Sequence, residues 1–318
     1  MHGRLYNEAE FAMRLRPRTP LLIKSGAATS LDPTMPEMAF VRTRRMGKKG
    51  DAIDEVYLPG SSLRGVIRAH AESLLRSIDL HHACDPFRMK PDQQSTLDWA
   101  CMTEKSLKGR TEKKADKLSG SEAWAYSCYA CRLFGNTGLA SRLRVGDFYI
   151  DGDEPLTETR HGVAIDRITG AVAQGPFELE TVTDGEFSGT ITLRNFTTGQ
   201  LGLLAAALLD LSDGLVSIGH AKSRGLGRVE LIFDRITFRF PRKPNPERTI
   251  KGIGALADPA THEAYKLPKA EEDVRNAAAA FESDPRGAFD TLTLKDDDET
   301  ARNWFDQIMT VWVEQLGK

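Results

Sequence analysis

Four cysteines offer the clearest chemistry in this sequence, because they are closely spaced in the middle of the chain. They are Cys84, Cys101, Cys128 and Cys131. Thiolates are zinc ligands, and the Cys128-x-x-Cys131 pair has the spacing of half a zinc knuckle. Four thiolates around one ion leave no open coordination position, so the pattern predicts a structural zinc site. The alternatives are a Cys3His site that uses His81 or His82, and free buried cysteines.

A glycine–serine turn at residues 58–68 carries side chains that suit a phosphate group. The turn opens a predicted helix, so unpaired backbone N–H groups and the hydroxyls of Ser61 and Ser62 can meet an anion there. Arg64 and Arg68 stand four residues apart and share one face of that helix. The segment lacks the Gly-Lys-Ser/Thr end of a Walker loop. A surface helix capped by Ser61 or Ser62, with solvated arginines, is the alternative.

A second basic loop, residues 219–228, lies late in the chain. Its glycines allow the backbone to approach a ligand closely, and Lys222, Ser223 and Arg224 supply charge and hydrogen-bond donors. The loop lies between two predicted strands, which argues against a dinucleotide site. A tight structural turn is the alternative. Further basic residues precede the first helix at Lys24, and at Arg42, Arg44 and Arg45.

Together these segments resemble the RAMP superfamily of CRISPR effector proteins, whose motifs recur here in the same order. The motifs are Leu-Pro-Gly-Ser-Ser-Leu-Arg-Gly at 58–65, Leu-Phe-Gly at 133–135, Asp-Arg-Ile-Thr-Gly at 166–170 and the late glycine-rich loop. The resemblance spans roughly residues 21–240 and is closest to the backbone subunits of type III effectors. The cysteine-rich insertion narrows it to the zinc-bearing III-D, III-E and type VII backbone proteins.

The resemblance implies a subunit that binds CRISPR RNA and shapes the guide–target RNA duplex in antiviral defence. Copies would polymerise along the RNA as a filament, with other effector subunits and a separate nuclease as partners. A thumb hairpin at about residues 160–175 would wedge into the duplex, with ordinary hairpin packing as the alternative for Ile165, Ile168 and Val172. The predicted RNA-binding residues are Lys24, Arg42, Arg44, Arg45, Ser61, Ser62, Arg64, Arg68, Arg160, Arg167, Lys222, Ser223 and Arg224.

Backbone subunits of type III effectors often cut target RNA with one loop aspartate before the Gly-Ser-Ser helix. Asp32 best matches that placement here, although it lacks the usual Gly-Gly-x-Asp surroundings and can instead cap a turn before Pro33. We therefore expect a binding subunit. A metal-dependent endoribonuclease that cleaves target RNA or processes the guide with Asp32 is the alternative. A zinc-stabilised RNA-binding protein unrelated to CRISPR is a third interpretation.

The elements that must position these groups follow the order strand, helix, strands, helix, strand. This order predicts an α+β fold with an RRM/ferredoxin-like core of split βαβ type. Strands are predicted at 11–24, 38–41, 55–58, 143–150, 215–218 and 229–240, a hairpin at 177–182 and 186–193, and helices from 61 to 78 and from 199 to 211. Residues 1–79 and 136–241 would form the palm core, 80–135 the zinc-binding insertion, and 242–318 a helical C-terminal extension with helices at 269–283 and 299–316.

The net charge at first argues against a nucleic-acid partner. The 318 residues contain 43 Lys and Arg against 45 Asp and Glu, a formal charge of −2, which excludes a simple polycationic coat. The charges are uneven, however, because residues 250–318 hold 8 basic and 14 acidic side chains. We therefore expect a basic working face and an acidic extension. No apolar run is long enough to cross a membrane, and the first ten residues lack a signal core, so a cytoplasmic location without a membrane partner is expected.

Overall fold

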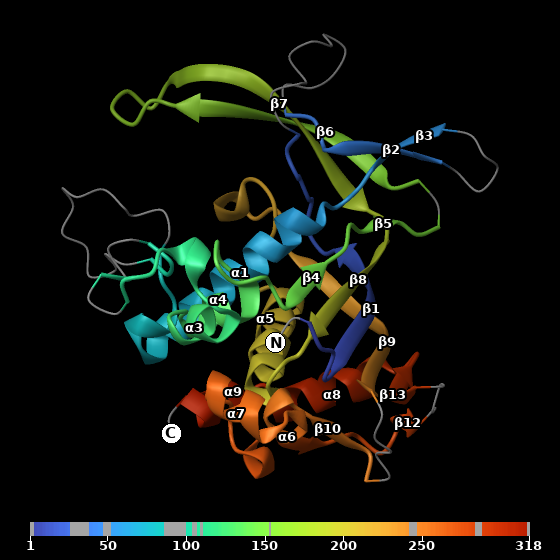
Figure 1. Ribbon diagram of the computed structural model, residues 1–318. Helices are drawn as coiled ribbons and strands as arrows, with labels where there is room; N and C mark the ends of the chain where they lie inside the picture. Colours follow the sequence, from blue (N-terminus) through green and yellow to red (C-terminus); the bar gives the residue numbers. More distant parts are fainter. Residues whose placement is uncertain are drawn as a thin grey trace.

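A computed structural model describes residues 3–25, 38–46, 52–85, 100–103, 107–108, 111–152, 154–241, 247–283 and 288–316. Its centre is a seven-stranded antiparallel sheet with the order β12-β13-β9-β1-β8-β4, in which β5 also pairs with β8 (Figure 1). The strands are β1 (Glu8–Pro17), β4 (Leu143–Val145), β5 (Tyr149–Ile150), β8 (Phe187–Arg194), β9 (Val229–Pro241), β12 (Glu282–Ser283) and β13 (Phe289–Lys295). The protein is thus α+β, as predicted. No helix among these residues is both long and apolar enough to span a membrane.

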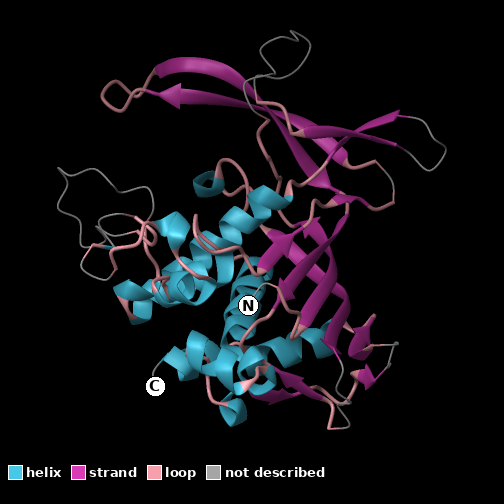
Figure 2. Cartoon of the chain, viewed as in Figure 1, coloured by secondary structure: helices cyan, strands magenta, loops and turns pink. Residues whose placement is uncertain are grey.

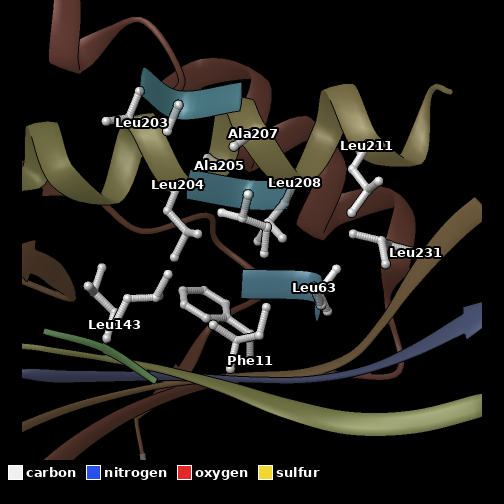
Figure 3. Packing of buried hydrophobic residues seen from close by; sticks show 14 of the residues in the cluster. Phe11, Leu63, Leu143, Leu203, Leu204, Ala205, Ala207, Leu208, Leu211 and Leu231 are labelled. Carbon is white, nitrogen blue, oxygen red and sulfur yellow. The ribbon is translucent and has the colours of Figure 1, made fainter. Parts of the chain in front are cut away.

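Strand β1 lies in the middle of the sheet, where it pairs with β8 on one edge and β9 on the other. Its sequence alternates apolar and polar residues over its whole length. Phe11, Met13 and Leu15 are buried and point to the helical side of the sheet. Two helices cover that face, α1 (Gly60–Ile78) and α5 (Thr198–Ser212) (Figure 2). Figure 3 shows Phe11 meeting leucines from both helices in this layer. Full burial of one such side chain contributes roughly 1.5–3 kcal/mol, so this layer dominates the stability of the core.

Helix α5 is apolar around its whole circumference because it is packed on every side. Helices α8 (Asp298–Ile308) and α9 (Val311–Leu316) pack against it and separate it from solvent. A capping box fixes its first turn, in which the Thr197 hydroxyl accepts the Gln200 N–H and the Gln200 side chain accepts the Thr197 N–H. The two C-terminal helices are therefore part of the core.

In the described part of the chain no helix covers the opposite face of the sheet, which carries paired charges. Glu8 accepts hydrogen bonds from Arg194 and Arg239, and Arg14 donates to Glu186 and Asp234, both at less than 3 Å. These residues come from three neighbouring strands. These ion pairs neutralise one another's charges on this face.

Two hairpins extend beyond the sheet. Strands β6 (Leu156–Ile165) and β7 (Val172–Asp184) form a long arm that projects from the core (Figure 1), and β2 (Arg42–Met46) pairs with β3 (Ala52–Val56). A hairpin is therefore present where residues 160–175 predict one. The predicted pairing of residues 177–182 with 186–193 is wrong, because β7 pairs with β6 and β8 pairs with β1. Gly185, at φ 132°, turns the chain from one sheet into the other.

The described part of residues 80–135 contains short helices and no strand. They are η2 (Leu80–His82), η3 (Ala115–Lys117), α3 (Gly120–Ala125) and α4 (Tyr129–Phe134). Helix α4 packs against α1, and α3 contacts α7. This segment therefore lies against both the core and the C-terminal part.

The C-terminal part is a mixture of strands and helices, which corrects the prediction of a purely helical extension. Its further elements are β10 (Thr249–Lys251), α6 (Ile253–Leu256), α7 (Pro259–Tyr265), η5 (Ala270–Glu272) and β11 (Val274–Asn276). The helix predicted at 269–283 is wrong because tertiary contacts override its alanine-rich sequence. The buried carboxylate of Asp273 accepts hydrogen bonds from the backbone N–H groups of Thr198 and Gly254, and Phe281 packs against Trp304.

Two smaller predictions near the C-terminal helices also change. The helix predicted at 299–316 is interrupted by a turn at Met309 and Thr310, which separates α8 from α9. The strand predicted at 215–218 is absent, since these described residues form a turn that leads to the glycine-rich loop. Strand β13, which no pattern predicted, adds to the sheet beside β9.

Candidate nucleic-acid interface and metal centre

The first turn of α1 is already engaged by a carboxylate from another part of the chain. The helix begins at Gly60, whose N–H donates to Asp147 Oδ1 at 2.7 Å. Neither Ser61 nor Ser62 caps the helix, because both lie inside its first turn and Pro59 takes the capping position. The Ser61 side chain is exposed and that of Ser62 is half-buried. An anionic ligand at this turn would therefore meet a negative charge.

Arg64 and Arg68 join α1 to the cysteine-containing segment instead of forming a free helical face. Arg64 donates to the Phe134 carbonyl and to Ser141 Oγ at 3.3 Å. Burial lowers the pKa of Arg64, and the positive charge of Arg68 lowers it further. Arg68 bonds Glu72 at 2.7 Å and lies 5.9 Å from the centre of the Phe134 ring. Both guanidinium groups thus have partners within the protein.

The late glycine-rich loop presents exposed donors on a firmly anchored backbone. Its short helix η4 (Lys222–Arg224) leaves all three side chains exposed. Gly227 N–H donates to the Pro20 carbonyl at 2.9 Å, and His220 N–H donates to the Leu22 carbonyl at 2.7 Å. Gly219, at φ 81°, lies so close to the Leu22 carbonyl that a side chain would not fit. The segment after β1 therefore holds the loop in place.

This anchoring brings together residues that are distant in sequence. Lys24, on the anchoring segment, and Arg224, in η4, both act electrostatically on the ring of His220. Two predicted RNA-binding residues therefore converge on a histidine that was not predicted. Its place in the glycine-rich loop was the available signal, but the sequence showed no partner for it.

The tip of the β6–β7 hairpin is built by the Asp-Arg-Ile-Thr-Gly segment. Asp166 Oδ1 accepts hydrogen bonds from the N–H groups of Ile168 at 2.9 Å and Thr169 at 2.7 Å, and from the Thr169 hydroxyl at 3.0 Å. These bonds lower the pKa of Asp166, with the backbone bond from Thr169 as the largest cause. Gly170 adopts φ 68° and completes the turn. Arg167 and Ile168 consequently point outward, and Ile168 is 95% exposed.

The remaining arginines of the two hairpins differ in how far they are engaged. Arg42 forms a bidentate pair with Glu180 at the base of β7, and Arg45 pairs with Glu55 and lies 5.1 Å from the Tyr149 ring centre. Arg160 pairs with the neighbouring Glu158. Arg44 is exposed on β2.

Four buried cysteines form a cluster that can hold a metal ion. Their sulfur atoms all lie within 4.8 Å of one another, and no disulfide joins them. Cys84 Sγ and Cys131 Sγ are 3.6 Å apart, close to the roughly 3.8 Å that a tetrahedral zinc site with 2.3 Å bonds requires. The Cys128 N–H donates to Cys101 Sγ at 3.1 Å, and hydrogen bonds from the other thiols, Cys101 first, lower the pKa of Cys84. The donor set therefore fits a thiophilic ion.

Histidine does not belong to this cluster in the part of the chain that is described. The His81 side chain is 82% exposed and pairs with Asp79 at 3.0 Å, and the metal-ligand group consists of cysteines alone. Helix α4 begins directly after Cys128, whose sulfur accepts the Cys131 N–H at 3.4 Å. The cluster thus fixes the start of α4.

The proposed catalytic aspartate cannot be placed, because Asp32 lies outside the described residues. Asp54 is described and is exposed on β3.

Comparison with known proteins decides the family. A model of the RAMP superfamily matches residues 14–230, which is more than half of the chain. The chain belongs to the RAMP superfamily. Members of the RAMP superfamily are CRISPR-associated RNA-binding proteins that work in complexes with RNA and other subunits. In this RAMP protein the matched segment runs from within β1 to the start of β9 and includes the cysteine cluster, the β6–β7 hairpin and the glycine-rich loop. No curated protein matches the chain.

Proposed function

We propose that this RAMP protein is a backbone subunit of an RNA-guided CRISPR effector complex, which binds CRISPR RNA and shapes the guide–target duplex. Base pairing would supply the sequence specificity, as in other RNA-guided effectors. The palm would comprise residues 1–79 and 136–241. The strand order β4-β8-β1-β9, with α1 after β1 and α5 after β8, supports an RRM/ferredoxin-like palm.

The observation that carries the proposal is the tip of the β6–β7 hairpin. Ile165 and Val172 are each 61% exposed and flank Ile168, which is almost fully exposed. Apolar side chains exposed to water are unfavourable, and their insertion between bases as a wedge removes this apolar surface from water. The hydrogen bonds of Asp166 hold the tip in one shape, and the exposed Arg167 is available to an adjacent phosphate.

Guide binding is assigned to exposed basic and hydroxyl residues of the glycine-rich loop and of the segment after β1 that anchors it. Lys24, Lys222, Ser223 and Arg224 form the main phosphate contacts in this proposal. Arg44 and Arg160 are secondary contacts. Arg42, Arg45, Arg64 and Arg68 act mainly by holding the hairpins and α1 in position. Ser61 and Ser62 contribute only where the backbone phosphate approaches from the exposed side of the turn.

The proposed cofactor is one structural zinc ion held by Cys84, Cys101, Cys128 and Cys131 in an insertion of residues 80–135. Zinc suits a closed set of four thiolates, which leaves no position for substrate. The ion would cross-link chain segments that otherwise contain only short helices. This feature also supports kinship with zinc-bearing III-D, III-E or type VII backbone proteins.

The proposed partners are CRISPR RNA, target RNA, further copies of the chain and other effector subunits. Copies that follow one another along an RNA make heterologous, head-to-tail contacts, which generate a filament. Cutting of the target is assigned to a separate nuclease subunit.

Co-expression of the chain with a repeat array tests this function. Repeat-derived RNA should copurify with the wild type and should be lost from the double variant Lys222→Glu/Arg224→Glu. The variant Lys266→Glu/Lys269→Glu makes a similar charge change at exposed sites in the C-terminal part and should retain the RNA. Absence of repeat-derived RNA from the wild type would overturn the proposal. Target cuts at regular intervals that Asp32→Ala abolishes would show instead that the subunit itself is an endoribonuclease.

A further inference from the structure

His220 occupies an unusual place in the glycine-rich loop, because its ring lies among cations. Arg224 Nη2 is 3.5 Å from His220 Nε2. A guanidinium can only donate hydrogen bonds, so Nε2 must act as the acceptor in this contact. The contact therefore favours the neutral imidazole with its proton on Nδ1.

Two features of the backbone fix the position of His220. The His220 N–H is bonded to the Leu22 carbonyl at 2.7 Å, and Ala221 adopts a left-handed conformation at φ 57°, directly before η4. Two elements face the ring in the described part of the chain, and each contributes one charged group. Arg224 comes from η4 and Lys24 from the segment after β1.

The electrostatics agree with this geometry. Burial lowers the pKa of His220, and the charges of Arg224 and Lys24 lower it further. Among the residues that the structure describes, no carboxylate contributes to the shift. Protonation of the ring would create a third positive charge in a small volume, which is unfavourable unless an anion neutralises it.

We propose that Lys24, His220 and Arg224 form a phosphodiester-binding site in which His220 takes up a proton from solvent when an RNA backbone phosphate binds. The proposal rests on the proposed RNA-binding function and adds a proton-linked ligand to it. The phosphate takes the hydrogen bond of Arg224 away from His220 Nε2. That nitrogen then gains a proton and donates to the phosphate, so three cations surround one anion.

The direction of the pH effect follows from this linkage. The bound phosphate raises the pKa of His220 above its value in the free protein, so proton uptake accompanies binding at any pH between the two values. RNA affinity therefore increases as the pH falls through this range and levels off below it. A difference of one pKa unit between free and bound states corresponds to about a tenfold change in affinity.

The first experiment measures binding of fluorescein-labelled single-stranded oligouridine to the full chain from pH 8 to pH 5.5 at constant ionic strength. We expect wild-type affinity to rise about tenfold over this range, as a shift of one pKa unit gives. His220→Gln keeps a neutral donor of similar size and should reduce the rise to about twofold. This remaining change is what the pH-dependent net charge of the protein alone would give. His262→Gln, on α7, is the matched control because its ring contacts the Pro268 carbonyl, and it should keep the wild-type slope.

A second measurement follows the titration of the ring in the wild-type protein itself. The Cε1–H resonance of His220 in the wild type, assigned by its loss in His220→Gln or by selective labelling, should titrate at a higher pH when oligouridine is present. Equal pH slopes for wild type and His220→Gln, or an unchanged His220 titration in saturating RNA, would overturn the proton linkage while leaving RNA binding intact. Failure of oligouridine to bind at any pH would overturn both this inference and the proposed function.

Discussion

At the tip of the β6–β7 hairpin, the Asp166 carboxylate is occupied by hydrogen bonds to its own turn. Asp166, Thr169 and Gly170 all serve the shape of the tip, through bonds of 3.0 Å or less and a positive φ. The side chains of Arg167 and Ile168 take no part in this network and face solvent, although the Ile168 backbone N–H bonds Asp166. Within one short segment, shape-determining residues are therefore separate from ligand-facing residues.

This division predicts that Ile168→Ser alters RNA behaviour without altering the fold. The side chain is 95% exposed, so the free energy of unfolding should change by less than about 0.5 kcal/mol. Pairing of a target RNA with the bound guide should weaken several-fold, because the wedge is lost. Leu156→Ser, at an equally apolar position that is 65% exposed at the base of the hairpin, is the control. Equal effects of the two substitutions on target pairing would contradict a specific role for the tip.

A second prediction concerns Glu186 on the open face of the sheet. Hydrogen bonds from Arg16 and then Arg14 lower its pKa below the ordinary value of 4.5. A carboxylate with a depressed pKa stabilises the fold above its ordinary pKa, and this stabilisation is lost as the pH falls through the folded-state value. Glu186→Gln should therefore lower the free energy of unfolding by roughly 1 kcal/mol or less at pH 7. Urea titrations should show this difference shrinking towards pH 3, and an undiminished difference there would refute the linkage.

The predicted site residues fall into two groups at this scale. Cys84, Cys101, Cys128 and Cys131 do converge, because type and spacing of thiols are strong constraints. Arg42, Arg64 and Arg68 have partners inside the protein that are 138, 70 and 4 residues away, respectively. The Arg68–Glu72 pair follows from i,i+4 spacing on one helix, but the partners of Arg42 and Arg64 depend on which elements pack together. For the same reason the sequence could not reveal that the charge of Lys24 acts on His220.

At the scale of elements, periodicity predicts the parts that are determined locally. Helix α1 ends at Ile78 as predicted, and the alternation in β1 correctly identifies a strand with one buried face. Strand pairing is different, because an alternating pattern shows which face is buried but not which neighbour is bonded. That is why β7 and β8 were assigned to one hairpin. The alanine run before Phe281 favours a helix locally, but the buried Asp273 and the aromatic cluster hold the chain in a short strand followed by a turn.

The metal centre gives a prediction at this scale, since it fixes α4. Cys101→Ser should reduce bound zinc from about one ion per chain to less than half, because a four-ligand site loses one thiolate. The melting temperature should fall by several degrees, since Arg132 on α4 stacks on Trp124, whose indole N–H bonds the Tyr265 carbonyl. His81→Gln should retain full zinc. Elemental analysis and calorimetry measure both effects, and loss of zinc from the histidine variant would support a Cys3His site instead.

At the scale of the whole molecule, the charge asymmetry has a structural counterpart. The projecting hairpin lies at one end of the molecule, and the C-terminal elements lie at the other (Figure 1). The acidic C-terminal part is an integral part of the fold. Strand β13 pairs with β9 inside the main sheet, and Trp304 and Phe305 are buried against Phe238 and Phe233. The acidic region of the sequence is thus built into the core.

This arrangement predicts the outcome of removing everything after Phe240. Truncation would expose the edge of β9, one side of α5 and the partners of Trp304, so we expect a chain that shows no cooperative thermal unfolding.

A separate variant tests the charge alone. Glu263→Gln/Glu271→Gln neutralises two exposed carboxylates of the C-terminal part without disturbing the core. Oligouridine affinity should stay within about twofold, because the C-terminal elements lie at the end opposite the hairpin (Figure 1) and salt screens exposed charges beyond about 10 Å. Circular dichroism melts and fluorescence anisotropy provide the two measurements. A truncated chain that still unfolds cooperatively would show that the core does not need the C-terminal part. A neutralised variant that binds RNA more than about tenfold tighter would mean that the acidic part restrains RNA binding.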